Sequence, residues 1–314
     1  MTIAEKKQTP QARGAAGANR ARLLLVLLCL IWGTTWPAMK IALDEIPPLS
    51  MRSSTAAIGA VVLLLICVIQ RRSFRVPNAR AWAHIVVASL LNVVALSLCS
   101  AFAQILAATS RVAILTYTLP VWTMLFAWAA LGERPNRVQA IAVGLCILGL
   151  AILVGPLAVT GIPLGLVLAL ATGISWAAGT VYLKWARIEA DAMAVASWQL
   201  TIAFFIIAAC LLAFDGSLDF RAAHADGLLA LLYTGVIGNA VAWALWFDLV
   251  RRLPAATASL GILGIPVIGV SSSVLLLGER PTATDLLGFA FIFAASACIV
   301  FAPQGVQADT TTPA

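Results

Sequence analysis

The sequence predicts an all-α integral membrane protein with ten transmembrane helices, arranged as two inverted repeats of five helices each. Composition is the first reason: of 314 residues, 62% are hydrophobic and only 11% are charged, whereas an ordinary soluble domain carries roughly 25% charged residues. A series of long charge-free stretches is the second. The third is an internal repeat, because Leu-Gly-Glu-Arg-Pro occurs at 131–135 and again at 277–281, 146 positions later.

Nine windows of the chain contain no Asp, Glu, Lys or Arg, and each predicts at least one crossing of the bilayer. They are 23–39, 53–70, 85–110, 112–132, 138–183, 192–214, 227–247, 253–278 and 286–307. The window 138–183 is long enough for two crossings at about 1.5 Å per residue. Gly155-Pro156 and Gly161-Ile162-Pro163 supply the turn between them. Ten crossings result, five in each half of the chain.

In the first half, helices should begin near positions 23, 48, 82, 111 and 138. Pro37 lies inside the first, and a Pro in a membrane helix frees a carbonyl, which fits a helix that lines a cavity or one with a simple kink. Asn92 lies well inside the third, where an amide either faces a cavity or bonds to a neighbouring helix. The fourth carries an unusually polar and aromatic run at 116–118. The fifth is aliphatic, and its Gly144 and Gly149 suit a packing or dimer face.

The second half begins at about Pro163 and follows the same order. Its first helix carries Trp176, its second Gln199, and its third both Asn239 and Trp243. The fourth repeats the proline of its counterpart in the first half, and the fifth is again aliphatic.

The odd number of crossings in each half makes the two halves inverted relative to one another in the membrane. Trp32 is followed eight residues later by Lys40, and Trp176 eight residues later by Lys184, so one Lys should lie outside and the other inside. Inverted repeats are typical of transporters that bind their substrate near the middle of the membrane. The expected division is a disordered basic N-terminus (1–21), a first repeat (22–156), a second repeat (157–303) and a C-terminal tail (304–314).

The distribution of charge predicts the orientation. With the N-terminus in the cytoplasm, 15 of the 20 Lys and Arg residues lie inside. They are Lys6, Lys7, Arg13, Arg20, Arg22, Arg71, Arg72, Arg75, Arg80, Arg134, Arg137, Lys184, Arg187, Arg251 and Arg252. The positive-inside rule therefore predicts that both termini are cytoplasmic. The net charge of +7 reflects this placement, so we expect no nucleic-acid partner.

These features together resemble a known family. Two five-helix repeats, an early Trp with Lys eight residues on, and a Leu-Gly-Glu ending of the fourth and ninth helices are similar to the drug/metabolite transporter superfamily, in its EamA-domain branch. The resemblance covers about residues 23–303. It implies ten helices, alternating access by rocking of the repeats, and export of small metabolites across the bacterial inner membrane. The abundance of Trp further resembles the YddG-type exporters of aromatic amino acids.

The candidate site is a central cavity between the repeats. No charged residue is predicted near the middle of the membrane, which favours a neutral or zwitterionic substrate with an aromatic or apolar body and a passive or weakly coupled exporter. Rings for stacking and side chains for hydrogen bonds are available there. The candidate substrate-binding residues are Trp32, Thr35, Asn92, Tyr117, Trp176, Gln199, Asn239 and Trp243, and the candidate hinges are Pro120 and Pro266. Each also has a structural interpretation, in helix packing or as an interfacial aromatic.

Alternative functions remain at this stage. A drug or other metabolite efflux transporter, with Asp248 or Glu133 carrying protons, is the nearest. A membrane enzyme is more distant, because the chain has only two histidines, His84 and His224, and no nucleophile or metal motif. The six cysteines all lie in apolar runs and form no CxxC pair. We expect no enzyme activity, cofactor or metal; the expected partners are a small-molecule substrate and membrane lipid, and the expected state is a monomer.

Overall fold

The computed structural model describes residues 10–155, 163–252 and 264–301, and every regular element in these ranges is a helix. The elements are α1 (Pro10–Glu45), α2 (Pro48–Ile69), α3 (Ala79–Ser89), η1 (Leu90–Ala95), α4 (Leu96–Leu106), α5 (Thr109–Thr116), α6 (Leu119–Leu131), α7 (Arg137–Val154), α8 (Leu164–Ala186), α9 (Ala192–Phe214), α10 (Ala225–Leu232), η3 (Tyr233–Val241), α11 (Ala242–Arg252), α13 (Gly264–Leu277) and α14 (Ala283–Phe301). Eight segments of these ranges are long and apolar enough to cross a membrane, and α13 and α14 contain shorter apolar helices. The prediction of an all-α membrane protein is confirmed.

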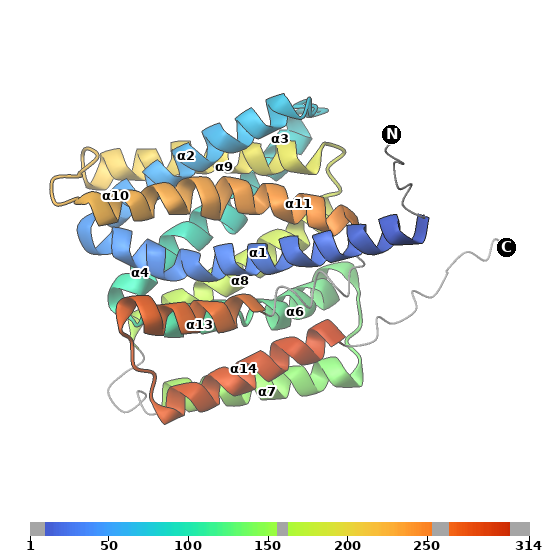
Figure 1. Cartoon of the computed structure of the whole chain (residues 1–314), viewed down its shortest axis with the longest axis vertical. Helices are drawn as coiled ribbons and strands as arrows, with labels where there is room; N and C mark the ends of the chain where they lie inside the picture. The colour runs from blue at the N-terminus through green and yellow to red at the C-terminus, as the bar shows by residue number, and fades with distance from the viewer. Residues whose placement is uncertain (1–9, 156–162, 253–263, 302–314) are drawn as a thin grey trace, which may run out of the picture.

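The helices lie side by side along one direction, and α1 begins and α14 ends at the same end of the bundle (Figure 1). Central α1 packs against α13 on one side and against α10, η3 and α11 on another, while α8 packs against η1, α4, α5 and α6. The remaining large contacts join α2 to α9, α7 to α14, α2 to η3 and α5 to α13. Two elements, η1 and η3, are π-helical. This conformation is rare, occurs mostly as short interruptions of α-helices and is frequent at functional sites.

The two ends of the bundle differ in their loops. At one end, called here the basic end, an ion pair joins Arg72 of the α2–α3 loop to Asp191 of the α8–α9 loop, and another joins Lys184 to Glu133 of the α6–α7 loop. At the opposite end, called here the far end, the backbone N–H of Asp219 in the α9–α10 loop donates to the Ser50 hydroxyl at 3.0 Å. The loops predicted to be cytoplasmic therefore lie together.

The largest hydrophobic core fills the half of the bundle nearest the far end. It contains Met39 and Leu43 of the last turns of α1 and Ile46 directly after that helix, together with residues of α2, α4, α5, α7, α8, α10, α13 and α14. Side chains of both halves of the chain therefore meet in this core, called here the far-end core.

Two expectations about the helices need correction or refinement. The sequence predicts disorder over 1–21, of which 1–9 lie outside the described residues. Over the remainder α1 begins at Pro10, because the five alanines between 12 and 21 favour helix. Gly149 of α7 serves packing within the chain, because a Cβ added there would lie 2.8 Å from Ile292 and 3.0 Å from the Gly288 carbonyl of α14. A Cβ at Gly144 would meet nothing within 4 Å.

Candidate functional site

A cavity of about 480 Å³ lies between the two halves of the chain. Its walls come from α1, η1, α6, α8, α9 and α11, and it extends to the α8–α9 loop at the basic end. The lining residues are Trp32, Asn92, Val93, Leu119, Thr123, Trp176, Thr180, Leu183, Ile188, Ala190, Ala192, Val195, Ala196, Gln199, Leu200, Trp243 and Trp246. None of these described residues is charged, so the cavity suits a ligand whose buried part is apolar.

Three indole rings form one wall of the cavity. The ring centroid of Trp32 lies 5.7 Å from that of Trp243, edge to face, and 6.0 Å from that of Trp246. The indole N–H of Trp32 donates to the Gly238 carbonyl of η3 at 3.2 Å, which fixes its orientation and satisfies a backbone group of the π-helix. Rings spaced in this way offer both faces and edges to an aromatic ligand.

The polar part of the wall joins two helices. The Asn92 amide nitrogen of η1 donates to the Gln199 side-chain oxygen of α9 at 3.3 Å, and both residues line the cavity. Asn92 packs closely on α8, where a Cβ added to Gly179 would lie 2.3 Å from its Oδ1 atom. Asn92 therefore combines the two roles that its position in the sequence left open, a cavity wall and a bond between helices.

Five of the eight candidate binding residues line the cavity: Trp32, Asn92, Trp176, Gln199 and Trp243. The other three lie elsewhere. The Thr35 hydroxyl donates to the Ile31 carbonyl of its own helix at 2.7 Å. Tyr117 is 5% exposed within the far-end core. The Asn239 amide nitrogen donates to the Thr55 carbonyl at 3.3 Å, so it ties η3 to α2.

Several lining residues were missed from the sequence, and some had a usable signal. Trp246 follows Trp243 by three residues and Thr180 follows Trp176 by four, and such spacings share one face of a helix. Extending the candidate set by helical spacing would have found both. Small apolar residues such as Val195 and Ala196 carry no comparable signal.

The two candidate hinges differ in their surroundings. Pro120 is the second residue of α6, directly after the chain leaves α5 at Thr116. In this break the Thr118 hydroxyl donates to the Leu115 carbonyl at 2.7 Å and accepts from the Trp122 indole at 3.0 Å. Pro266 is buried near the start of the described part of α13. Their roles as hinges stay predictions.

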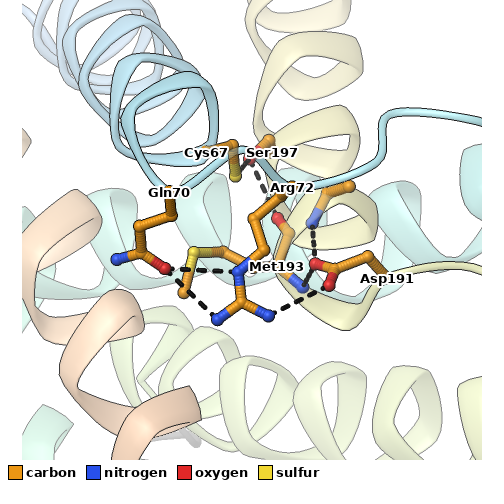
Figure 2. A network of polar contacts seen from close by, with 7 residues as sticks. Cys67, Gln70, Arg72, Asp191, Met193 and Ser197 are labelled. Carbon is orange, nitrogen blue, oxygen red and sulfur yellow. Dashed lines mark hydrogen bonds and ion pairs between the residues drawn. The ribbon is translucent and has the colours of Figure 1, made fainter.

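A polar network at the basic end positions the start of α9 (Figure 2). Asp191 caps this helix by accepting from the backbone N–H groups of Met193 and Ala194 at 3.0 and 3.1 Å. Its other oxygen accepts from Arg72 at 3.2 Å, and Arg72 also donates to the Gln70 side chain. Since α9 supplies several residues of the cavity wall, this network sets the position of the wall.

At the far end, two carboxylates of the second half of the chain bind groups of the first half. The two oxygens of Glu279 accept from the backbone N–H groups of Thr109 and Ser110 at 2.5 and 2.9 Å; this contact is called here the far-end latch. Beside it, Arg111 donates twice to Asp285, at 2.7 and 3.0 Å. Both contacts join the first half of the chain to the second. Glu133, the equivalent of Glu279 in the first repeat, instead pairs with Lys184 at the basic end.

Comparison with known proteins supplies the family. The sequence profile described as the EamA-like transporter family matches residues 19–155 and 163–301, most of the chain. The chain belongs to the EamA-like transporter family. The predicted EamA membership is thereby confirmed, and this family member is a multi-pass membrane protein of transporter type.

Individual relatives agree with this placement. The EamA-family chain is 25% identical over 272 residues to the "Uncharacterized transporter YoaV" of Bacillus subtilis, covering 86% of this chain and 92% of that protein. It is 25% identical over 281 residues to the "Probable amino-acid metabolite efflux pump" of Escherichia coli, covering 86% and 91%, and 24% identical over 272 residues to that organism's "Uncharacterized inner membrane transporter YedA", covering 85% and 86%. A crystal structure matches with a TM-score of 0.63 at 21% identity, over 90% of this chain and 97% of the other, which supports the fold alone.

Proposed function

We propose that this EamA-family transporter exports small amphipathic metabolites, foremost aromatic and hydrophobic amino acids, by alternating access. The observation that carries the proposal is the cavity of about 480 Å³, with its wall of Trp32, Trp243 and Trp246 and its uncharged lining. Small-molecule sites usually have volumes of about 300–1,000 Å³, mostly apolar walls and a few polar groups. Asn92 and Gln199 are such groups here. The relative named as an amino-acid metabolite efflux pump supports the same substrate class.

The proposal includes ten crossings in two inverted repeats. The helix contacts support it, because exchanging the halves exchanges equivalent contacts. The pairing of α1 with α13 corresponds to that of α8 with α5 and α6, and the pairing of α1 with η3 and α11 corresponds to that of α8 with η1 and α4. The pairs α2–α9 and α7–α14 correspond to themselves.

The orientation follows from charge. The basic end lies in the cytoplasm with both termini, and the membrane is a bacterial inner membrane, as in the relative named an inner membrane transporter. The cavity reaches the basic end while the far-end latch and core close the other, so the conformation described is open toward the cytoplasm. Substrate enters from the cytoplasm and leaves once the far end separates.

The uncharged lining of the cavity also indicates whether transport is coupled to the movement of protons or sodium ions. A proton or sodium relay requires a titratable or charged group that changes its partner during the cycle, and no such group lines the cavity among the residues described. We therefore propose transport down the substrate gradient, without strict ion coupling, by a monomer surrounded by lipid.

The test is uptake into proteoliposomes of radiolabelled phenylalanine, tryptophan, methionine, a charged amino acid and a cationic dye, with and without a pH gradient. Uptake of the apolar amino acids without need of the gradient supports the proposal. Trp32→Ala should lower it about tenfold, since one stacking ring contributes about 0.5–1.5 kcal/mol beyond its buried area. Trp128→Ala, which changes a half-exposed indole on the bundle surface, is the matched control. If only the dye moves, and only with the pH gradient, the proposed function is wrong and drug efflux is indicated instead.

A further inference from the structure

Arg52 is a buried positive charge without a carboxylate. It lies in the second turn of α2, near the far end, and is only 6% exposed. One guanidinium nitrogen donates to the Ser100 hydroxyl of α4 at 2.7 Å and contacts the Met39 sulfur of α1, while its Nε atom is buried without a partner. No Asp or Glu in the described ranges pairs with it. An Arg near a helix end normally extends to the membrane interface, but the Arg52 side chain is buried in the protein.

A second unsatisfied group lies on the neighbouring helix. Gln104 follows Ser100 by one turn of α4, so the two side chains share a face. It is 1% exposed, and both its amide atoms lack a hydrogen-bond partner. Buried polar groups are almost always satisfied, and an unpaired buried charge costs several kcal/mol. Two such groups, linked through Ser100, which bonds to Arg52 and lies one turn from Gln104, indicate a ligand that is absent from this conformation.

The repeat indicates when that ligand could arrive. Over the first two helices of each half, equivalent residues are 144 positions apart: Trp32 and Trp176, Lys40 and Lys184, Glu45 and Glu189, Ser53 and Ser197. The helices α2 and α9 also begin 144 positions apart, at Pro48 and Ala192. At this spacing Arg52 corresponds to Ala196 and Met39 to Leu183, and both of these second-half residues line the cavity at the basic end. In an inverted-repeat transporter, the cavity open at the other end is lined by the equivalent residues of the other half.

We infer that Arg52, with Ser100 and Gln104, binds the carboxylate of the transported molecule in the conformation that is open at the far end. The guanidinium offers two parallel N–H donors to a carboxylate, and the Gln104 amide adds a further donor. The Ser100 hydroxyl accepts from Arg52 and donates to the Ser97 carbonyl at 3.1 Å, so it positions the guanidinium. In the conformation described here, Met39 and the far-end core cover the group. The inference rests on the proposed export of amino acids and identifies how a transporter with an uncharged central cavity selects a zwitterion over an amine.

The experiment measures competition at the far-end face in membrane vesicles of known orientation, with radiolabelled phenylalanine as substrate. Two competitors divide the amino acid: 3-phenylpropionate keeps the carboxylate and phenethylamine keeps the ammonium. Arg52→Gln should weaken inhibition by 3-phenylpropionate about 30-fold, the factor given by about 2 kcal/mol of lost charge-assisted hydrogen bonding. The same substitution should change inhibition by phenethylamine by no more than about twofold. Arg52→Lys, which keeps the charge but loses the two-pronged geometry, should fall between.

Two further variants guard the interpretation. Arg221→Gln removes an exposed Arg from the loop at the same end. It should leave the inhibition by both competitors unchanged. Gln104→Leu removes an amide without hydrogen-bond partners, so it should raise the melting temperature of the protein. It should still weaken the inhibition of transport by 3-phenylpropionate. Should Arg52→Gln fail to fold, Gln104→Leu and Arg52→Lys still decide the matter.

The outcomes separate this inference from the function on which it rests. If Arg52→Gln weakens inhibition by both competitors equally and lowers the melting temperature, Arg52 serves only in packing and the inference is overturned. A chloride-dependent melting temperature that Arg52→Gln abolishes, with 3-phenylpropionate unaffected, would assign the site to a free anion and also overturn it. If wild-type protein moves no amino acid, the proposed function fails, but stabilisation of the purified protein by 3-phenylpropionate, lost in Arg52→Gln, would still support the carboxylate site.

Discussion

The far-end latch offers the sharpest test of alternating access. Glu279 joins the halves of the chain at the far end by accepting two backbone N–H groups at the start of α5. Replacing it with Gln keeps the size and one acceptor but places an NH₂ group against the second backbone donor. Opening of the far end should therefore become easier, while the fold of each half is left intact.

The expected magnitude follows from the geometry. A hydrogen bond to a charged group contributes about 1.5–3 kcal/mol, and a carboxylate at a helix N-terminus about 0.3–1 kcal/mol more. Because Glu279 is only partly buried, a net loss of about 2 kcal/mol is expected. Since 1.4 kcal/mol is a factor of ten, the population open at the far end should rise about 30-fold.

The assay is cysteine labelling. Thr55→Cys is introduced into a protein whose six native cysteines are replaced; Thr55 is buried and corresponds, 144 positions earlier, to the cavity residue Gln199. A membrane-impermeant maleimide should label this position about 30-fold faster when Glu279→Gln is added. Glu133→Gln is the matched control, because its partner Lys184 is exposed and such ion pairs contribute little. An unchanged labelling rate with Glu279→Gln would refute the latch, and an equal rise with Glu133→Gln would refute its asymmetry.

Three further predictions concern the helices around the site. Gly179→Ala should lower the transport rate about tenfold, because the new Cβ would lie 2.3 Å from Asn92 and displace it from the cavity wall; normal flux would show that the amide is dispensable. Asp191→Ala should lower stability by about 1–2 kcal/mol through loss of the α9 cap, measured as thermal unfolding in detergent, and Asp191→Asn should restore most of it. Gly149→Leu should cost about 1–3 kcal/mol by separating α7 from α14 in the same unfolding assay, whereas Gly144→Leu, with nothing within 4 Å, should be neutral; equal effects would contradict the packing described.

The sequence was sufficient for the membrane class and for part of the cavity. Trp32 and Trp176 were found because the repeat places them equivalently, and Asn92 and Gln199 because amides are rare at that depth. The same argument predicts Thr35 and Asn239 as binding residues, but their hydrogen bonds go to backbone carbonyls. Polarity inside a membrane helix marks a group that needs a partner, and composition does not reveal whether that partner is a ligand or another helix.

The burial of Arg52 was beyond reach of pattern reasoning for a different reason. A charged residue four positions into a helix normally extends to the interface, and the hydropathy windows simply begin after it. Its inward direction depends on which face of α2 meets α1 and α4, a matter of helix rotation. The 144-residue spacing of the repeat does indicate an inward direction for Arg52, since the equivalent residue Ala196 lies on the cavity wall.

The π-helical turns have a consequence for how these helices tolerate insertion and deletion. A π turn accommodates one residue more than an α turn, and each residue of an α-helix advances the side-chain direction by about 100°. The face of η1 that presents Asn92 to the central cavity is therefore offset from the face of α4 that presents Ser100 to Arg52. Deleting a single residue within η1 would restore a regular helix and turn one of these faces away from its target. Deletion of one residue here should thus be more damaging than substitution of the aliphatic residues on either side of Asn92.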